Sequence, residues 1–312
     1  MKIVHEFNFD LVTDFTSVCY SVVVDGKREK IRYNNRCMKG QVFMKENNNR
    51  IEMVVFDWAG TTVDYGSSAP MEVFKMVFDE AGINLTRSEI NGPMGMEKKA
   101  HIRLLLSLDA AKNQWISKYN RDWTEADVEE LYNKFEEKLY ELVASYSSPI
   151  EGIVETVNNL RERGMKIGST TGYNKQMMKK VIPVAKEQGY EPDCVVTPDD
   201  TGVGRPTPFM LNECMRLLNV YPPKNVVKVG DTITDIYEGK NAGAWSIGVL
   251  VGSNLLGLTK DEYDAISATE LDVLKDITTK KYMEAGADMV IDSITELPMA
   301  IEKINQMMAN EE

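Results

Sequence analysis

From Ile51 onward, short apolar runs alternate with longer segments whose apolar residues recur every three or four positions. The short runs are typical of buried β-strands, and the longer segments are typical of amphipathic helices. The pattern predicts strands at 53–56, 166–169, 194–196, 226–229 and 246–249, and helices at 153–163, 175–188, 208–218 and 233–242. Such alternation predicts an α/β fold, in which a parallel sheet is covered by helices on both faces.

A long stretch without any strand signal separates the first predicted strand from the second. Its apolar spacing predicts helices at 71–80, at 87–90 running on through 98–107, and at 124–144. A helical insertion directly after the first strand should sit as a cap over the strand ends. We therefore predict a core formed by 51–66 and 147–312 and a helical cap formed by 67–146, with hinges at Gly66 and at 147–149.

The first 50 residues have a different pattern. Residues 16–24 are rich in β-formers, Asp25-Gly26 is a strong tight-turn signal, and residues 30–33 can return as a second strand. Three asparagines at 47–49 then suggest a linker. We expect residues 1–50 to form a small N-terminal β appendage that carries no chemical motif and serves in packing or at an oligomer edge.

The composition narrows the classes of function. The 312 residues carry a formal net charge of −12, which argues against a broad basic surface for nucleic acid or anionic lipid. Two histidines and four scattered cysteines nearly exclude a histidine-based zinc site. Since no long apolar run or cleavage pattern is present, we expect a reduced, cytoplasmic protein that does not contact a membrane. An anionic substrate would then need local positive charge or a metal.

Two apolar strands of the predicted sheet end at carboxylates. Asp57 follows the first strand and precedes a small loop, and the backbone N–H groups of Gly60 and Thr61 in that loop suit a phosphoryl group. A single aspartate at a strand end is more often a turn or cap residue. However, Asp231 and Asp235 follow another strand in the same way. Carboxylates meeting at one edge of a parallel sheet form an oxygen-rich site suited to Mg²⁺.

Two more strand ends complete a candidate phosphate site. The segment 168–172 supplies a hydroxyl group and loop amides, and Arg205 supplies a fixed cation after Gly204. Each segment alone has an ordinary structural explanation. All four in order, at the ends of successive strands, are hard to ascribe to chance.

These motifs resemble those of the haloacid dehalogenase superfamily over about residues 51–312, with matches at Asp57, Thr171, Arg205 and Asp231/Asp235. The resemblance implies a Rossmann-like core with an inserted cap, an aspartate that attacks phosphorus to form an aspartyl-phosphate, and Mg²⁺ as cofactor. Phosphatases of the superfamily carry a second aspartate two residues after the nucleophile, which protonates the leaving group. Ala59 stands there in this chain. A poor leaving group therefore needs another form of activation.

The predicted cap contains a candidate for that activation. Residues 93–103 gather Lys98, Lys99, His101 and Arg103 near a glycine. A lysine can form a Schiff base with an aldehyde, and the iminium withdraws electrons from the adjacent carbon. A carbon–phosphorus bond next to that iminium would then break to give an enamine, and no acid at position 59 is needed. Alone, this segment would more often be a solvated helix face.

Further stretches resemble the phosphonatases, the branch of this superfamily that hydrolyses the carbon–phosphorus bond of phosphonoacetaldehyde. They are FDWAGTTVDYG, PMG, KxxHxR, GSTTGY, VTPDD, GRPTP and VGDTITD. The resemblance implies that Asp57 is the nucleophile and that Lys98 forms the Schiff base. Spacing alone does not choose between Lys98 and Lys99, and the family pattern selects Lys98. Its cationic neighbours Lys99 and Arg103 are expected to lower its pKa and leave more free amine.

The same resemblance implies roles for the remaining site residues. Mg²⁺ would be held by Asp57, the backbone carbonyl of Ala59 and Asp231, with Asp235 binding directly or through water. Thr171, Gly172 and Arg205 would hold the phosphonyl oxygens. The aldehyde and Lys98 would be surrounded by Met94, Tyr173 and His101, and His101 would assist proton transfer during imine formation.

Two other functions stay open at this point. One is a phosphate-ester hydrolase or sugar-phosphate mutase of the same superfamily. The other is a non-catalytic phosphate-binding or regulatory relative whose β appendage recruits a protein partner. The resemblance also leads us to expect a homodimer built through cap helices. An apolar stripe at 71–77, with Phe74 and Phe78, would be available for that contact, although such stripes are more often cap core.

Overall fold

The computed structural model describes residues 17–24, 27–34, 49–94, 96 and 98–310. The chain divides into two compact units, Met1–Asn48 and Asn49–Glu312. In the first unit, β1 (Ser17–Val24) pairs antiparallel with β2 (Lys27–Asn34), which confirms the predicted hairpin. The predicted Asp25-Gly26 turn and most of the asparagine linker lie outside the described residues.

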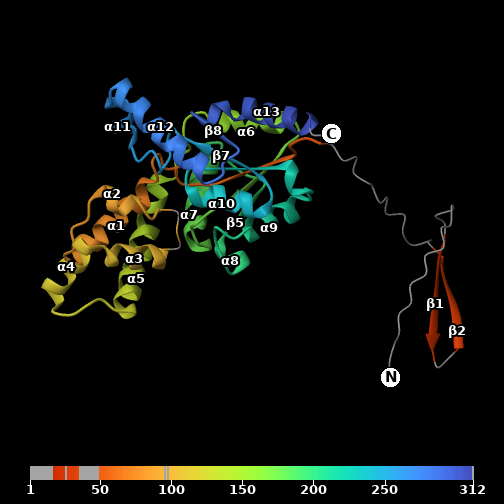
Figure 1. Cartoon of the computed structure of the whole chain (residues 1–312), viewed down its shortest axis with the longest axis horizontal. Coiled ribbons are helices and arrows are strands. Elements are labelled where there is room, and N and C mark those ends of the chain that lie inside the picture. The colour runs from red at the N-terminus through yellow and green to blue at the C-terminus, as the bar shows by residue number, and fades with distance from the viewer. Residues whose placement is uncertain (1–16, 25–26, 35–48, 95, 97, 311–312) are drawn as a thin grey trace. The chain divides into compact units, whose positions relative to one another are not determined.

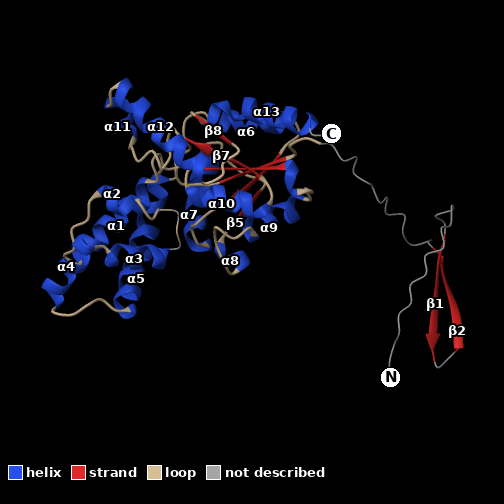
Figure 2. Ribbon diagram, viewed as in Figure 1, coloured by secondary structure: helices blue, strands red, loops and turns tan. Residues whose placement is uncertain are grey.

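The second unit is built on a six-stranded sheet with the order β5-β4-β3-β6-β7-β8, and all neighbouring strands are parallel (Figures 1 and 2). The five predicted strands are confirmed, and β8 at the sheet edge is an addition. The strands are β3 (Met53–Phe56), β4 (Lys166–Thr170), β5 (Cys194–Val196), β6 (Val226–Gly230), β7 (Trp245–Val249) and β8 (Met289–Ile291).

Helices cover both faces of this sheet, as predicted. Along β3, Val54 and Phe56 belong to the large apolar cluster that includes residues of α6 and α13, whereas Met53 and Val55 pack with residues of α9. The helices outside the cap are α6 (Ile153–Glu162), α7 (Lys175–Glu187), α8 (Pro198–Thr201), α9 (Phe209–Leu218), α10 (Ile233–Ala242), α11 (Lys260–Ala265), α12 (Ala268–Glu284) and α13 (Leu297–Asn310), with short 3₁₀ helices η2 (Pro223–Asn225) and η3 (Ile294–Glu296).

Five helices and a 3₁₀ turn fill the insertion after β3 and lie together beside the sheet (Figure 1). The continuous helix predicted over 87–107 is wrong, because α2 ends before Gly92 and Pro93 and α3 begins only at Lys98. A further helix, α4, was not predicted. The elements of the insertion, which is the predicted cap, are α1 (Ser68–Glu80), α2 (Arg87–Asn91), α3 (Lys98–Ser107), α4 (Asp109–Tyr119), α5 (Glu125–Leu142) and η1 (Val143–Tyr146).

The apolar stripe on α1 lies inside the cap. Phe74 and Phe78 are both fully buried, and the Phe74 ring packs 4.3 Å from the ring of Phe135 on α5, measured between centroids. These side chains form cap core, so they are not available as a dimer surface.

The two segments that join cap and core run next to each other. Ile150 donates its backbone N–H to the Thr62 carbonyl at 2.8 Å, and Val63 forms an antiparallel bridge with Pro149. Gly66 has a φ of 77°, in the region that favours glycine. The chain thus leaves the core and returns to it at one place.

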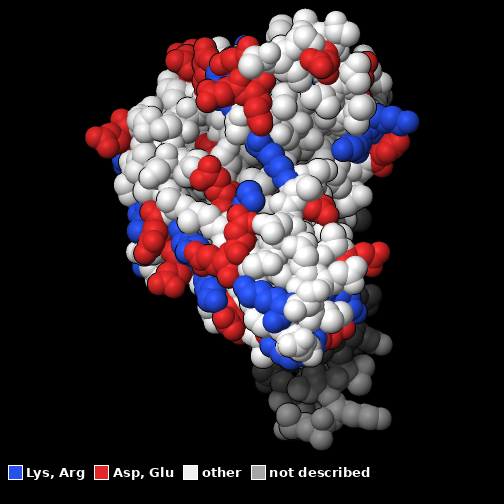
Figure 3. Space-filling view, turned by 90° about the vertical axis from the view of Figure 1, so that its left-hand side faces the viewer, with Lys and Arg blue, Asp and Glu red and all other residues white. Residues whose placement is uncertain are grey.

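The surface shown in Figure 3 carries a mixture of charges. Lys and Arg side chains alternate there with Asp and Glu side chains, so positive charge is not concentrated on this face. Among the described helices, none combines the length and the apolar character needed to cross a membrane.

Candidate active site

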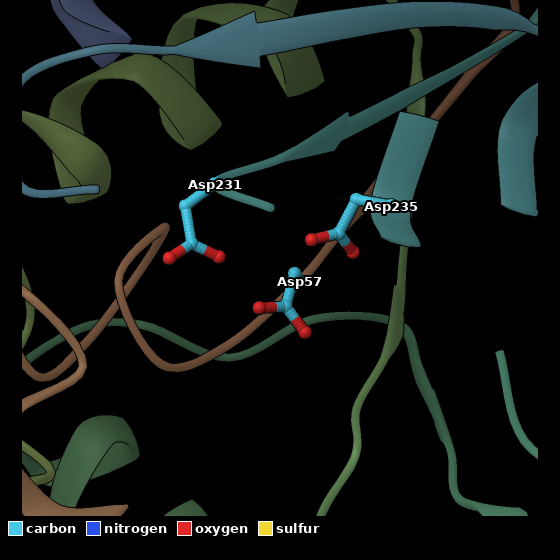
Figure 4. A group of neighbouring side chains, drawn as sticks. All are labelled: Asp57, Asp231 and Asp235. Carbon is cyan, nitrogen blue, oxygen red and sulfur yellow. The ribbon is translucent and has the colours of Figure 1, made fainter. Parts of the chain in front are cut away.

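Three aspartates from separate elements converge at the carboxyl ends of the central strands (Figure 4). Asp57 directly follows β3, Asp231 directly follows β6, and Asp235 lies in the first turn of α10. Because Phe56 pairs with Val229 across β3 and β6, the two strands end nearly level. The three side chains each offer a carboxylate oxygen, and these oxygens lie within 4.8 Å of one another.

Burial makes this carboxylate cluster electrostatically costly. Desolvation, together with the charge of Asp235, raises the pKa of Asp57. Desolvation and the charges of Asp57 and Asp235 likewise raise the pKa of Asp231 well above its usual value. Three buried carboxylates that repel one another are suitable ligands for a divalent cation, because its charge would offset the repulsion.

Arg205 joins two of these aspartates. Its side chain is only 6% exposed, its Nη2 donates to Asp57 Oδ1 at 2.5 Å, and its Nη1 donates to Asp235 Oδ1. Burial opposes ionisation of Asp235, but Arg205 and Lys228 outweigh that effect and lower its pKa. The predicted fixed cation is therefore present at the carboxylate cluster, where it forms ion pairs with two of the three aspartates.

Asp231 is fixed by hydrogen bonds from the surrounding loops. Its Oδ2 accepts the Asn254 backbone N–H at 2.9 Å, and its Oδ1 accepts the Thr61 hydroxyl at 3.3 Å. The Ser67 hydroxyl lies 3.4 Å from the same Oδ2 and donates at 2.8 Å to the carbonyl of Ala59, the predicted backbone metal ligand. A side chain at Gly60 would overlap the Asp231 carboxylate, so this approach requires glycine.

The backbone amides predicted to cradle a phosphoryl group are used inside the loop instead. The Gly60 N–H donates to the carbonyls of Val63 and Asp64, and the Thr61 N–H donates to the Trp58 carbonyl. The loop is a tight turn that satisfies its own donors. Thr61 contributes to the site through its hydroxyl group.

The turn after β4 lies beside Arg205. The buried Thr171 hydroxyl accepts the Tyr173 backbone N–H at 3.1 Å, and a Cβ on Gly172 would lie 4.0 Å from Arg205 Nη2. Tyr173 is also buried, and its hydroxyl has no hydrogen-bond partner among the described residues. Burial and the charges of Asp64, Asp57 and Asp231 raise its pKa, so the phenol stays a neutral donor.

In the cap, Lys98 begins α3 beside aromatic side chains. Its Nζ lies 5.6 Å from the centroid of the Phe74 ring and 5.9 Å from that of Phe135. His101 is one helical turn further along, and the centroid of its ring lies 4.0 Å from that of the Phe74 ring, with the two planes tilted by 38°. The lysine and the histidine thus share one partly buried, aromatic-walled face of the helix.

His101 is held as a neutral imidazole. Its Nε2 lies 2.9 Å from the Ile90 carbonyl, which can only accept, so Nε2 carries the hydrogen. Its Nδ1 has no partner in the described part of the chain. Burial, reinforced by the charge of Lys98, lowers the pKa of His101 to about 3. The ring therefore offers an unprotonated nitrogen beside Lys98.

The two other cations of this segment have carboxylate partners on α5. Lys99 pairs with Glu129 at 2.7 Å, and Arg103 pairs with Glu125 at 2.9 Å. These partners offset the positive charge that we expected to lower the pKa of Lys98.

Met94 and α2 connect this part of the cap to the core. Met94 is buried in the turn after α2, where its N–H donates to the Asn91 carbonyl at 3.0 Å. The Asn91 side chain accepts a hydrogen bond of 3.3 Å from Asn254, whose backbone holds Asp231. The loop that positions the carboxylate cluster thus also contacts the cap.

Comparison with known proteins agrees with this geometry. Residues 51–243 match the model of the haloacid dehalogenase-like hydrolases. Phosphonoacetaldehyde hydrolase of Bacillus cytotoxicus is 48% identical over 257 residues, which are 82% of this chain and 97% of the relative. The chain belongs to the phosphonoacetaldehyde hydrolase family. A relative of the same name from Bacillus cereus is 45% identical over the same shares of both chains.

A solved structure extends the family likeness to three dimensions. The phosphonoacetaldehyde hydrolase-like protein of Oleispira antarctica superposes with a TM-score of 0.81 at 37% identity, over 84% of this chain and 95% of that one. At this identity and TM-score, the two chains share one fold over most of their length.

Several residues at the site of this family member escaped sequence reasoning. Asn254 lies in a loop without a recognisable signal, and the resemblance indicates that Ser67 lies near the substrate but does not predict its contacts with Ala59 and Asp231. Lys228 and Glu238 had visible signals, because a lysine inside the apolar run of β6 is unusual and Glu238 lies one turn after Asp235 on α10.

A titration tests the state of His101. In a His5→Gln variant, His101 is the only histidine of the chain, and we expect its ring to stay neutral from pH 8 to pH 5. Because its folded pKa lies below the usual 6.5, the unfolded chain binds the proton more readily, and this group destabilises the fold as the pH falls from about 6.5 toward 3. Imidazole NMR shifts measure the ring directly. A midpoint near pH 6.5 would contradict the buried, neutral state.

Proposed function

We propose that this chain hydrolyses the carbon–phosphorus bond of phosphonoacetaldehyde to give acetaldehyde and phosphate. The observation that carries the proposal is a pair of features. First, the core brings three aspartates together with Arg205, but position 59 holds an alanine in place of the acid that would protonate a leaving alkoxide. Second, the proposed cap carries Lys98 close to a neutral histidine, His101. The family relationship supports the same substrate.

The first step takes place on Lys98. Its uncharged amine attacks the aldehyde carbon, and loss of one water gives a protonated imine. His101 Nδ1 takes a proton from the nitrogen of the adduct and returns it to the oxygen that leaves as water, since its other nitrogen is occupied by Ile90, and one proton from solvent supplies the charge of the iminium. Met94 and Tyr173 enclose the aldehyde end of the substrate. The cap must bring Lys98 over Asp57, because the two side chains belong to cap and core.

The second step takes place on Asp57. A carboxylate oxygen attacks phosphorus, and the electron pair of the carbon–phosphorus bond moves toward the iminium to give an enamine on Lys98. Arg205, Thr171 and Gly172 hold the phosphonyl oxygens during the transfer. Water then attacks the phosphorus of the aspartyl-phosphate and releases phosphate. Protonation of the enamine carbon and hydrolysis of the imine release acetaldehyde and restore the lysine.

The proposed cofactor is Mg²⁺, held by Asp57, the Ala59 carbonyl and Asp231, with Asp235 binding directly or through water. The bound ion would offset negative charge on the carboxylates and the phosphonyl group. We expect EDTA to reduce turnover by about 100-fold or more and added Mg²⁺ to restore it. Mg²⁺ should also raise the melting temperature, because it binds the folded carboxylate cluster. A metal-free protein with full activity and an unchanged melting temperature would contradict this assignment.

The decisive experiment compares acetaldehyde release from phosphonoacetaldehyde with hydrolysis of simple phosphate esters, both with Mg²⁺. We expect rapid acetaldehyde release and little ester turnover, because Ala59 cannot protonate an alkoxide. Efficient turnover of the esters alone would instead identify a phosphate-ester hydrolase or mutase. Inactivity on both would identify a non-catalytic phosphate-binding relative.

Three broader features belong to the same proposal. They are a cytoplasmic location, a homodimer formed through the cap, and a division into core and cap with hinges at Gly66 and 147–149, about which the cap moves. Analytical ultracentrifugation tests the dimer, since a monomer at micromolar concentration would contradict it.

A further inference from the structure

A second buried cation lies beneath Arg205. Lys228 is the middle residue of β6, and its side chain is fully buried. Its Nζ donates to the Thr170 hydroxyl at 2.8 Å and lies 3.1 Å from both Asp235 Oδ1 and Glu238 Oε2. Three acceptors thus face the three hydrogens of the ammonium group.

Glu238 completes this arrangement from α10. It is fully buried, and its Oε2 accepts the Thr170 hydroxyl at 2.9 Å and lies 3.9 Å from Arg205 Nε. Its Oε1 has no partner among the residues that the structure describes. The proposed reaction uses neither Lys228 nor Glu238, yet both charges are withdrawn from water directly beside the phosphate-binding arginine.

Both carboxylates that Lys228 contacts also face Arg205. Asp235 Oδ1 accepts a hydrogen bond from Arg205 Nη1 and also lies 3.1 Å from Lys228 Nζ. Glu238 Oε2 lies 3.1 Å from Lys228 Nζ and 3.9 Å from Arg205 Nε. We propose that Lys228 and Glu238 are positioning residues that fix Asp235 and Arg205 and thereby set the geometry in which the phosphonyl oxygens are bound. This inference rests on the proposed role of Arg205 in holding those oxygens.

The number of buried charges supports pairing Lys228 with Glu238. Beside the two cations Arg205 and Lys228, the cluster holds four carboxylates, so it carries two excess negative charges that one divalent cation would balance. Loss of Lys228 alone would leave three excess negative charges and a buried carboxylate without its cation. Loss of Lys228 and Glu238 together leaves the balance unchanged. The four carboxylates are those of Asp57, Asp231, Asp235 and Glu238.

The double variant Lys228→Met/Glu238→Gln therefore separates position from charge. We expect it to fold and to keep its stabilisation by Mg²⁺, because the excess charge is the same. Its dissociation constant for inorganic phosphate in the presence of Mg²⁺ should rise about tenfold or more, since small displacements of a binding group are costly. The constant is measured by isothermal titration calorimetry, and kcat should fall with it.

The matched control is Arg163→Met/Glu302→Gln, which removes an ion pair of 2.9 Å between the residue that follows α6 and a residue of α13. We expect its phosphate affinity to equal that of the wild type. If the Lys228/Glu238 double variant also binds phosphate within twofold of the wild type, the pair only stabilises the fold and the proposal is wrong. Should the double variant not fold, Glu238→Gln alone, which keeps the shape of the side chain, must show the same loss of phosphate affinity.

The proposed function fails in a different way. A wild-type chain that neither binds phosphate nor turns over phosphonoacetaldehyde would overturn the function. Normal wild-type binding with an unaffected double variant would overturn only the positioning role.

Discussion

Replacement of Lys98 by arginine should lower acetaldehyde release by about four orders of magnitude or more. The guanidinium keeps the positive charge over the Phe74 and Phe135 rings but cannot condense with an aldehyde. A role of Lys98 in charge or packing alone would survive this change. The loss therefore isolates the covalent step, and it is measured by a coupled assay of acetaldehyde.

Lys99 provides the matched control, because it is the adjacent residue on α3 and pairs with Glu129. Lys99→Arg should keep turnover within a few-fold of the wild type. Borohydride added during turnover should reduce the imine and leave a stable adduct on Lys98, which peptide mass spectrometry locates. An adduct on Lys99, or an active Lys98→Arg variant, would show that the Schiff base is misplaced.

The second large effect is expected at the nucleophile. Asp57→Asn should also reduce phosphate release by about four orders of magnitude, because an amide does not form the acyl-phosphate. This substitution should not destabilise the fold. Burial raises the pKa of Asp57, so its ionised form is costly in the folded chain, and Arg205 keeps its other carboxylate partners. We expect a melting temperature equal to or above that of the wild type.

The two variants should differ in one informative respect. In Asp57→Asn the aldehyde still reaches Lys98, so borohydride should trap the imine although no phosphate appears. In Lys98→Arg neither event should occur. If Asp57→Asn loses both the trapping and the turnover while it stays folded, then Asp57 is needed to bind the substrate and the two-step order is wrong.

The sequence predicted the core better than its periphery, and the reason lies in burial. Strands such as β3 are buried on both faces and read as unbroken apolar runs. In α12, by contrast, only Thr278 and Tyr282 are buried, and β8 has three residues, so neither gives a clear period. The break between α2 and α3 was missed although Gly92 and Pro93 mark it.

The site was predictable where a motif carries the chemistry and unpredictable where contacts do. Asp57, Asp231, Asp235 and Arg205 are indicated by their strand ends, and the structure brings them together. The contact of Ser67 with the Ala59 carbonyl depends on the path of the loop and has no local signature. The reuse of loop amides within the turn likewise depends on backbone geometry.

In the proposed division into core and cap, the paired linkers at Val63 and Pro149 would make the cap a separable module. Because the chain exits and re-enters the core at one point, where Ile150 bonds to Thr62, the inserted helices can vary in length and sequence without changing the register of any strand. Natural variation could then replace the lysine-bearing cap and leave the proposed phosphorus chemistry of the core intact. Substrate choice and phosphoryl transfer would then evolve as two independently exchangeable parts of one chain.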